Sequence, residues 1–127
     1  MTPELKIKKQ IILLAIADEL VPADTRLEDI DIEEVFEEYN LDGGDIYYEF
    51  REGNVETGLD CEWSRHYESK SVASKMSDGS WVGWTYWYGG GKHAEPDIID
   101  WVEGAYDLDC NEREVLTLVR TFSKVKI

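Results

Sequence analysis

Basic residues are almost missing from positions 18 to 62 of this 127-residue chain. The stretch holds 17 Asp and Glu against two Arg, so its formal charge of −15 equals the net charge of the whole sequence. The remaining positions balance, with 11 basic and 11 acidic residues. A concentrated acidic field repels nucleic acid and anionic membranes and attracts basic protein surfaces. We therefore expect a protein partner with a basic surface, and no direct contact with nucleic acid or membrane.

Cysteines and long apolar segments are also scarce. The two cysteines, Cys61 and Cys110, favour free thiols in a reducing compartment, and a bridge stays open only if the fold makes them neighbours. The apolar run Ile11–Ala17 follows three lysines but ends at Asp18. A bilayer span needs about 20 apolar residues, and no small-residue cleavage pattern follows the run. The sequence therefore predicts a cytoplasmic chain.

Metal-site spacings are absent as well. The Cys and His residues are separated by 5, 27 and 17 positions, and none of these spacings makes a short chelating pair. In the acidic stretch, Asn40–Asp45 lacks the later bidentate glutamate of a calcium loop. We expect neither a metal nor a cofactor. The Cys and His residues considered are Cys61, His66, His93 and Cys110.

No catalytic motif is present, so we do not expect an enzyme. Gly89–Gly91 precedes Lys92 and His93, but this loop has neither phosphate-loop nor dinucleotide-binding spacing. Glu95 and Asp97 would compete with a phosphate for the start of a following helix. The two histidines have no accompanying nucleophile. A weaker alternative is a small-ligand site made by Trp84, Tyr86, Lys92 and His93.

Two helices are predicted at the start of the chain. Thr2 caps the first and Pro3 begins it, and apolar residues then recur at helical spacing until the segment stops before Pro22. Asp31 caps a second, short helix with one apolar face that begins at Ile32. Its opposite face consists of Glu33, Glu34, Glu37 and Glu38.

Strand patterns follow these helices. Residues 45–51 alternate between polar and apolar and predict a strand, and residues 59–76 predict a longer one. Asp78 and Gly79 then predict a hairpin turn into the aromatic strand 81–88.

A helix and a strand are predicted to close the chain. Apolar residues at helical spacing after Pro96 predict a helix as far as Tyr106, and residues 114–122 predict a β-branched strand. The order is α-α-β-β-β-α-β. It predicts one α+β domain over residues 1–127, with a mostly antiparallel sheet of about four strands.

The aromatic strand allows two interpretations, because rings lie on both of its faces. A central strand covered on both sides would bury them all. A sheet with one open face would instead present Trp81 and Trp87 to a partner, and Trp and Tyr are the residues most often found at binding hot spots.

The acidic stretch also allows two interpretations. A solvated face serves solubility alone, but such faces usually mix charges of both signs, and this stretch hardly does. We therefore predict a partner-binding surface. Its acidic residues are Glu33, Glu34, Glu37, Glu38, Asp42, Asp45 and Glu49.

The favoured function is that of a small acidic, non-enzymatic binding protein. In size and charge alone, the chain resembles the acidic inhibitors that phages and mobile elements use against host nucleic-acid enzymes. The narrower hypothesis is thus a viral inhibitor or DNA mimic, since regularly spaced carboxylates imitate the phosphates of a duplex. The alternative is a homo-oligomeric assembly module, in its simplest form a homodimer, built on the apolar first helix and the aromatic strand.

Overall fold

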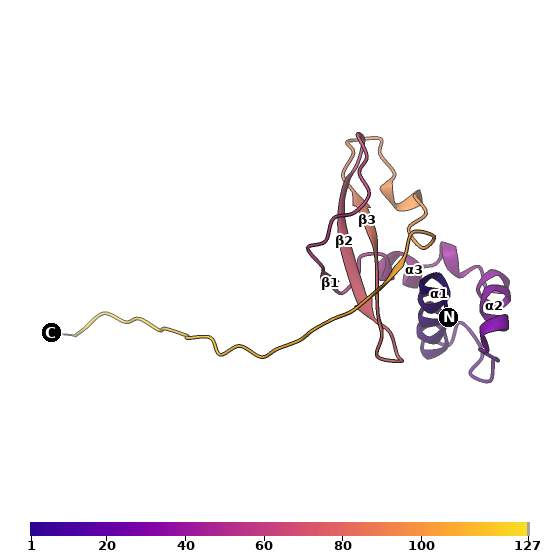
Figure 1. Cartoon of the computed structure of the whole chain (residues 1–127), viewed down its shortest axis with the longest axis horizontal. Coiled ribbons are helices and arrows are strands. Elements are labelled where there is room, and N and C mark those ends of the chain that lie inside the picture. Colours follow the sequence, from indigo (N-terminus) through magenta and orange to yellow (C-terminus); the bar gives the residue numbers. More distant parts are fainter. Residues whose placement is uncertain (127) are drawn as a thin grey trace.

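The computed structural model describes residues 1–126 as a compact body followed by a long extended tail (Figure 1). Three helices lie on one side of a four-stranded antiparallel sheet with the strand order β1-β2-β3-β4, so the predicted α+β class is confirmed. The elements are α1 (Pro3–Ala17), α2 (Ile32–Glu38), α3 (Asp45–Phe50), β1 (Val55–Glu56), β2 (Glu68–Lys75), β3 (Trp81–Tyr88) and β4 (Tyr106–Leu108). Short 3-10 turns are η1 (Asp29–Asp31), η2 (Leu41–Gly43) and η3 (Pro96–Ile98).

Helices α1 and α2 begin where the sequence predicts. The Thr2 hydroxyl accepts a hydrogen bond from the Leu5 N–H at 3.3 Å, and Pro3 occupies the first position of α1. One detail at α2 differs from expectation. The Asp31 carboxylate does not cap α2 but accepts the Glu28 N–H at 3.2 Å, which closes the preceding 3-10 turn.

The predicted hairpin is also confirmed. Strands β2 and β3 pair from Glu68 with Tyr88 to Lys75 with Trp81. In the turn, the Asp78 carboxylate accepts the Ser80 N–H at 2.9 Å, and Gly79 has a φ of 89°, which favours glycine. The predicted long strand is only partly correct, because residues 59–67 form a loop and β2 begins at residue 68.

The prediction of a strand over residues 45–51 is wrong, because these residues form α3. Alternation placed Ile46 and Phe50 on one face of a strand, but residues four apart also share one face of a helix. The helix lets the neighbouring Tyr47 join them at the core, with its ring 6.4 Å from that of Phe36. Tertiary packing therefore decided between two periods that the short segment satisfies equally well.

The helix predicted from Pro96 to Tyr106 is also wrong, because it shrinks to η3. The Asp100 carboxylate accepts the N–H groups of Val102 and Glu103, at 3.1 and 3.3 Å. Such local bonds compete with helical ones. The chain then continues into β4, which replaces residues 114–122 as the last strand.

The strand predicted over residues 114–122 is wrong for this single chain. The segment has no strand partner, and its large apolar side chains are exposed. The sheet already ends at β4, and the tail leaves the body beyond that strand (Figure 1). A β-branched composition favours a strand, but a strand forms only where another edge pairs with it.

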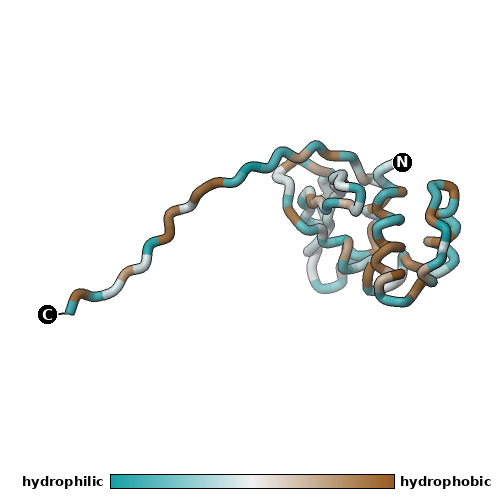
Figure 2. The backbone as a smooth tube through the Cα atoms, turned by 90° about the horizontal axis from the view of Figure 1, so that it is seen from below, coloured by the Kyte–Doolittle hydropathy of each residue, from teal (hydrophilic) through white to brown (hydrophobic). Residues whose placement is uncertain are grey.

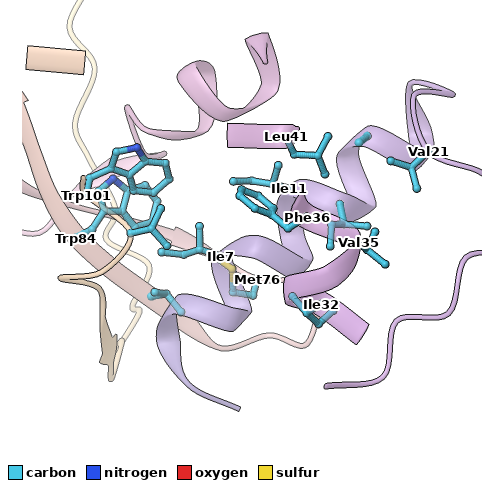
Figure 3. Close-up of a cluster of buried hydrophobic side chains, with 14 of the residues drawn as sticks. Ile7, Ile11, Val21, Ile32, Val35, Phe36, Leu41, Met76, Trp84 and Trp101 are labelled. Carbon is cyan, nitrogen blue, oxygen red and sulfur yellow. The ribbon is translucent and has the colours of Figure 1, made fainter. Parts of the chain in front are cut away.

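The core lies between the helices and the inner face of the sheet. Ile7 and Ile11 of α1 are fully buried, and Trp84 of β3 and Trp101 pack together with ring centroids 5.1 Å apart. Figure 3 shows these two rings at one end of the core, with aliphatic side chains between them and α2. No helix within residues 1–126 is long and apolar enough to cross a bilayer.

The two buried tryptophans differ in hydrogen bonding, which gives a matched test. The Trp84 indole N–H donates to the Arg51 carbonyl at 2.8 Å, whereas the Trp101 Nε1 has no partner among the described residues. We expect Trp84→Phe to lower the free energy of unfolding by about 1–3 kcal/mol more than Trp101→Phe, because it alone removes the donor from a buried carbonyl. Urea unfolding of both variants measures the difference. Equal losses would contradict this role of the bond.

Candidate protein-binding surface

The seven predicted carboxylates are all exposed and lie on consecutive segments of the helical side. Four project from α2, one from η2 and two from α3. Helix α2 buries Ile32, Val35 and Phe36, so its glutamates necessarily face solvent. The sequence prediction of an acidic exposed face on this helix is therefore correct, whereas the two carboxylates of α3 were assigned to a strand.

Packing joins these segments into one acidic lobe, defined here as residues 32–50. Leu41 of η2 is buried, and Phe36 of α2 contacts Tyr47 of α3 through their rings. Asn40 adopts a left-handed conformation with a φ of 49°, which turns the chain between α2 and η2. The fold thus gathers carboxylates that the sequence distributes over 17 positions, from Glu33 to Glu49.

Among the described residues, one of the seven carboxylates has a basic partner, because Lys8 Nζ lies 2.8 Å from Glu33. Of the two arginines in the acidic stretch, Arg26 pairs with Glu28 at 3.4 Å in an exposed contact. Arg51 is buried, donates to the Trp87 carbonyl and lies 4.7 Å from the Tyr86 ring centroid. A guanidinium withdrawn into the body leaves the surface carboxylates without its direct contact.

A hollow of about 460 Å³ borders the acidic lobe and is also lined by residues from the segment 97–102. It combines negative charge with aromatic surface. Four carboxylates and three rings line it: Glu4, Asp42, Asp97, Asp100, Phe36, Tyr47 and Tyr48.

Lys8 lies in the wall of this hollow, and its surroundings show that the hollow stabilises a positively charged side chain. Its Nζ is 2.8 Å from Glu33, 3.2 Å from Glu4 and 5.4 Å from the centroid of the Phe36 ring. Burial disfavours its charged form, but hydrogen bonds to Glu33 and Glu4 outweigh burial and raise the pKa of Lys8. Carboxylates and a ring face therefore stabilise a basic side chain here.

Tyr47 stands at the same hollow with a perturbed hydroxyl. Burial, helped by the charges of Asp100 and Asp42, raises the pKa of Tyr47 to about 12. The phenol therefore stays neutral at physiological pH and does not add to the negative charge. It supplies an aromatic wall with one O–H group.

Most of the tryptophan surface of the aromatic strand β3 is buried in the body. Trp84 is fully buried and Trp87 is 7% exposed, while Trp81 is half-buried at the sheet's end. Gly83 is covered by the Tyr106 ring, which a Cβ at that position would approach within 2.6 Å. Of the two rings predicted to contact a partner, Trp81 retains accessible surface and Trp87 retains little.

The residues of the alternative small-ligand site are not equally accessible. Trp84 is in the core and Tyr86 is half-buried, whereas Lys92 and His93 are exposed on the glycine loop. Trp84 therefore offers no ring face to a ligand bound beside Lys92 or His93. Within residues 1–126, no group of three or more His, Cys, Asp or Glu is placed to hold a metal, and both cysteines are free.

Sequence reasoning missed part of this surface. Lys8 lies within the first predicted helix, and Asp97 and Asp100 lie within the helix predicted after Pro96, so neither pattern indicates that they meet. Trp63 is 80% exposed on the loop before β2, and no pattern around it in the sequence indicated an exposed ring. No local pattern could have found the hollow, because its lining residues range from position 4 to position 102.

Comparison with known proteins assigns no relative. No protein-family model, curated protein or solved structure matches this chain.

The perturbed phenol predicts an alkaline loss of stability. Above pH 10 the unfolded chain releases the Tyr47 proton while the folded chain keeps it up to about pH 12, so ionisation favours unfolding. The stabilising contribution of Tyr47 is complete below pH 10 and declines as the pH rises toward 12. We expect Tyr47→Phe to lose less stability than the wild type between pH 8 and about pH 11. Urea midpoints across this range provide the measurement, and parallel curves would contradict it.

Proposed function

We propose that this protein is a non-enzymatic binding protein whose acidic lobe engages a basic surface of another protein. The observation that carries the proposal is the one-sided display of seven exposed carboxylates on α2, η2 and α3. Complementary charge across an interface accelerates association and selects partners of opposite sign. Binding through this lobe is accordingly fast and sensitive to salt.

The hollow beside the lobe supports a more specific mode of contact. Carboxylates supply charge and the rings supply faces on which a cation can rest, as Lys8 rests near Phe36. A lysine or arginine of the partner would enter this hollow, while the surrounding glutamates meet neighbouring basic residues. Arginine suits it better, because its planar group can bind a carboxylate and stack on a ring together.

The class of partner that fits best is a nucleic-acid enzyme. Extended basic grooves on proteins commonly serve to bind phosphate backbones. An acidic lobe that occupies such a groove excludes the nucleic acid and thereby inhibits the enzyme. The chain would then act as a DNA mimic, in the manner of a small viral inhibitor.

The test separates the acidic face from net charge. The test variant changes Glu33, Glu34, Glu37 and Glu38 to Gln, and the matched control changes four other exposed glutamates. We expect wild type and control to capture a basic partner from cell lysate at low salt and to lose it at high salt, and the test variant to capture none, because the complementary charges are gone. Affinity capture with mass spectrometry measures this. The control positions are Glu62, Glu68, Glu103 and Glu112, each exposed.

Equal capture by both variants would reduce the acidic lobe to a solvated face and overturn the proposal. For a captured partner that binds DNA, titration with duplex DNA decides the narrower hypothesis. Competition between DNA and this protein supports mimicry. Simultaneous binding of both rejects mimicry but leaves the acidic interface intact.

A further inference from the structure

The tail contains apolar side chains that the single chain leaves uncovered. We define the apolar tail as residues 115–126. Figures 1 and 2 show it running away from the body, with apolar segments in the open. Its large apolar side chains are 70% to 103% exposed, and they are Val115, Leu116, Leu118, Val119, Phe122 and Val125. Six such residues within a twelve-residue tail differ from scattered surface apolar residues and indicate a contact surface.

The apolar tail and the rest of the chain carry opposite charges. The tail has a charge of +3, from Arg120, Lys124 and Lys126, and no acidic residue. Residues 1–114 therefore carry −18, and the whole chain carries −15. The tail therefore has a positive charge, which an acidic surface attracts, and apolar side chains, which fit an apolar groove. A second copy of this chain supplies both an acidic body and a groove.

A suitable groove lies at the root of the tail. It has a volume of about 330 Å³ and crosses the outer face of the sheet, opposite the helices. Val55, Leu59, Trp81 and Leu108 provide its apolar lining, and Asp109–Asn111 form its rim where the tail departs. Val55 and Leu59 are 47% and 53% exposed, so the groove accepts additional apolar side chains.

We propose that the apolar tail of one copy docks in this groove of a second copy, in a reciprocal dimer. Because each tail leaves from the rim of its own groove, a two-fold axis near the rims places both grooves within reach of both tails. Such an interface is isologous and closes on itself. An extended segment of 12 residues spans up to about 40 Å, enough to cross to the neighbour.

Docking of the tail in its own groove is the competing arrangement. It requires the chain to reverse direction immediately after β4. Residues 109–126 form no turn or bend in the structure. The chain continues outward instead, which favours the groove of a second copy. This dimer is independent of the acidic lobe on α2 and α3.

The test uses full-length variants in sedimentation-equilibrium ultracentrifugation. The tail variant combines Leu116→Ser, Leu118→Ser and Phe122→Ser, and the groove variant combines Val55→Ser and Leu59→Ser. We expect wild type to dimerise and each variant to raise the dimer dissociation constant by roughly 30-fold or more, as loss of a binding hot spot does. A control with Thr117→Ala and Thr121→Ala leaves the dimer unchanged.

Mixing the two variants gives the sharper result. The tail variant keeps an intact groove and the groove variant keeps an intact tail, so an equimolar mixture regains one of the two contacts. We expect heterodimers in the mixture where neither variant alone associates. Circular dichroism of each variant confirms that the body remains folded.

Three outcomes would overturn the proposal. A dimer unaffected by the tail variant would use a different interface. A monomeric wild type with hydrogen-exchange protection in residues 115–126 would place the tail in its own groove. A monomeric wild type with an unprotected tail would assign the tail to a different partner. None of these outcomes alters the prediction for Glu33, Glu34, Glu37 and Glu38, so the two proposals fail separately.

Discussion

The contact between α3 and β3 is the interaction on which the rest of the body depends. The Trp84 indole donates to the carbonyl of Arg51 at the end of α3, and its ring stacks on Phe50 with centroids 5.4 Å apart. Trp101 then packs against the same rings, which fixes the segment between η3 and β4. One aromatic cluster thereby joins the helices, the sheet and the connection before the last strand. Aromatic side chains suit this role because each buries a large area and accepts several packing geometries.

This arrangement also determines where the charge lies. Helices α2 and α3 each give one face to the core, so their carboxylates face outward on adjoining segments. The Arg51 side chain instead points into the body, where its guanidinium donates to the Trp87 carbonyl and lies beside the Tyr86 ring. The acidic lobe is thus a direct consequence of the apolar contacts that fold the helices. A basic residue that packs inside the body cannot offset a surface carboxylate by direct pairing.

The body and the tail divide the chemistry of the chain. The body carries the acidic charge and buries an apolar core, whereas the tail is basic and leaves all of its large apolar side chains exposed. An acidic surface alone gives fast but salt-sensitive binding, and an apolar segment alone gives contact without electrostatic guidance. Their presence in one chain permits two kinds of association at separate places. The acidic lobe lies on the helical side, and the groove lies on the outer face of the sheet.

The sequence by itself determined α1, α2, the Asp78–Gly79 hairpin and β3. Capping residues, turn residues and a sustained regular spacing of apolar residues each act locally. It also identified the seven acidic residues of the candidate surface. Tertiary structure decided α3, where Ile46 and Phe50 fit both a strand and a helix, and the segment after Pro96, where Asp100 competes with helical bonds. It alone placed Lys8 beside Phe36 and assembled the hollow and the groove. Those features depend on side chains distant in sequence, and their meeting is set by core packing rather than by any local pattern.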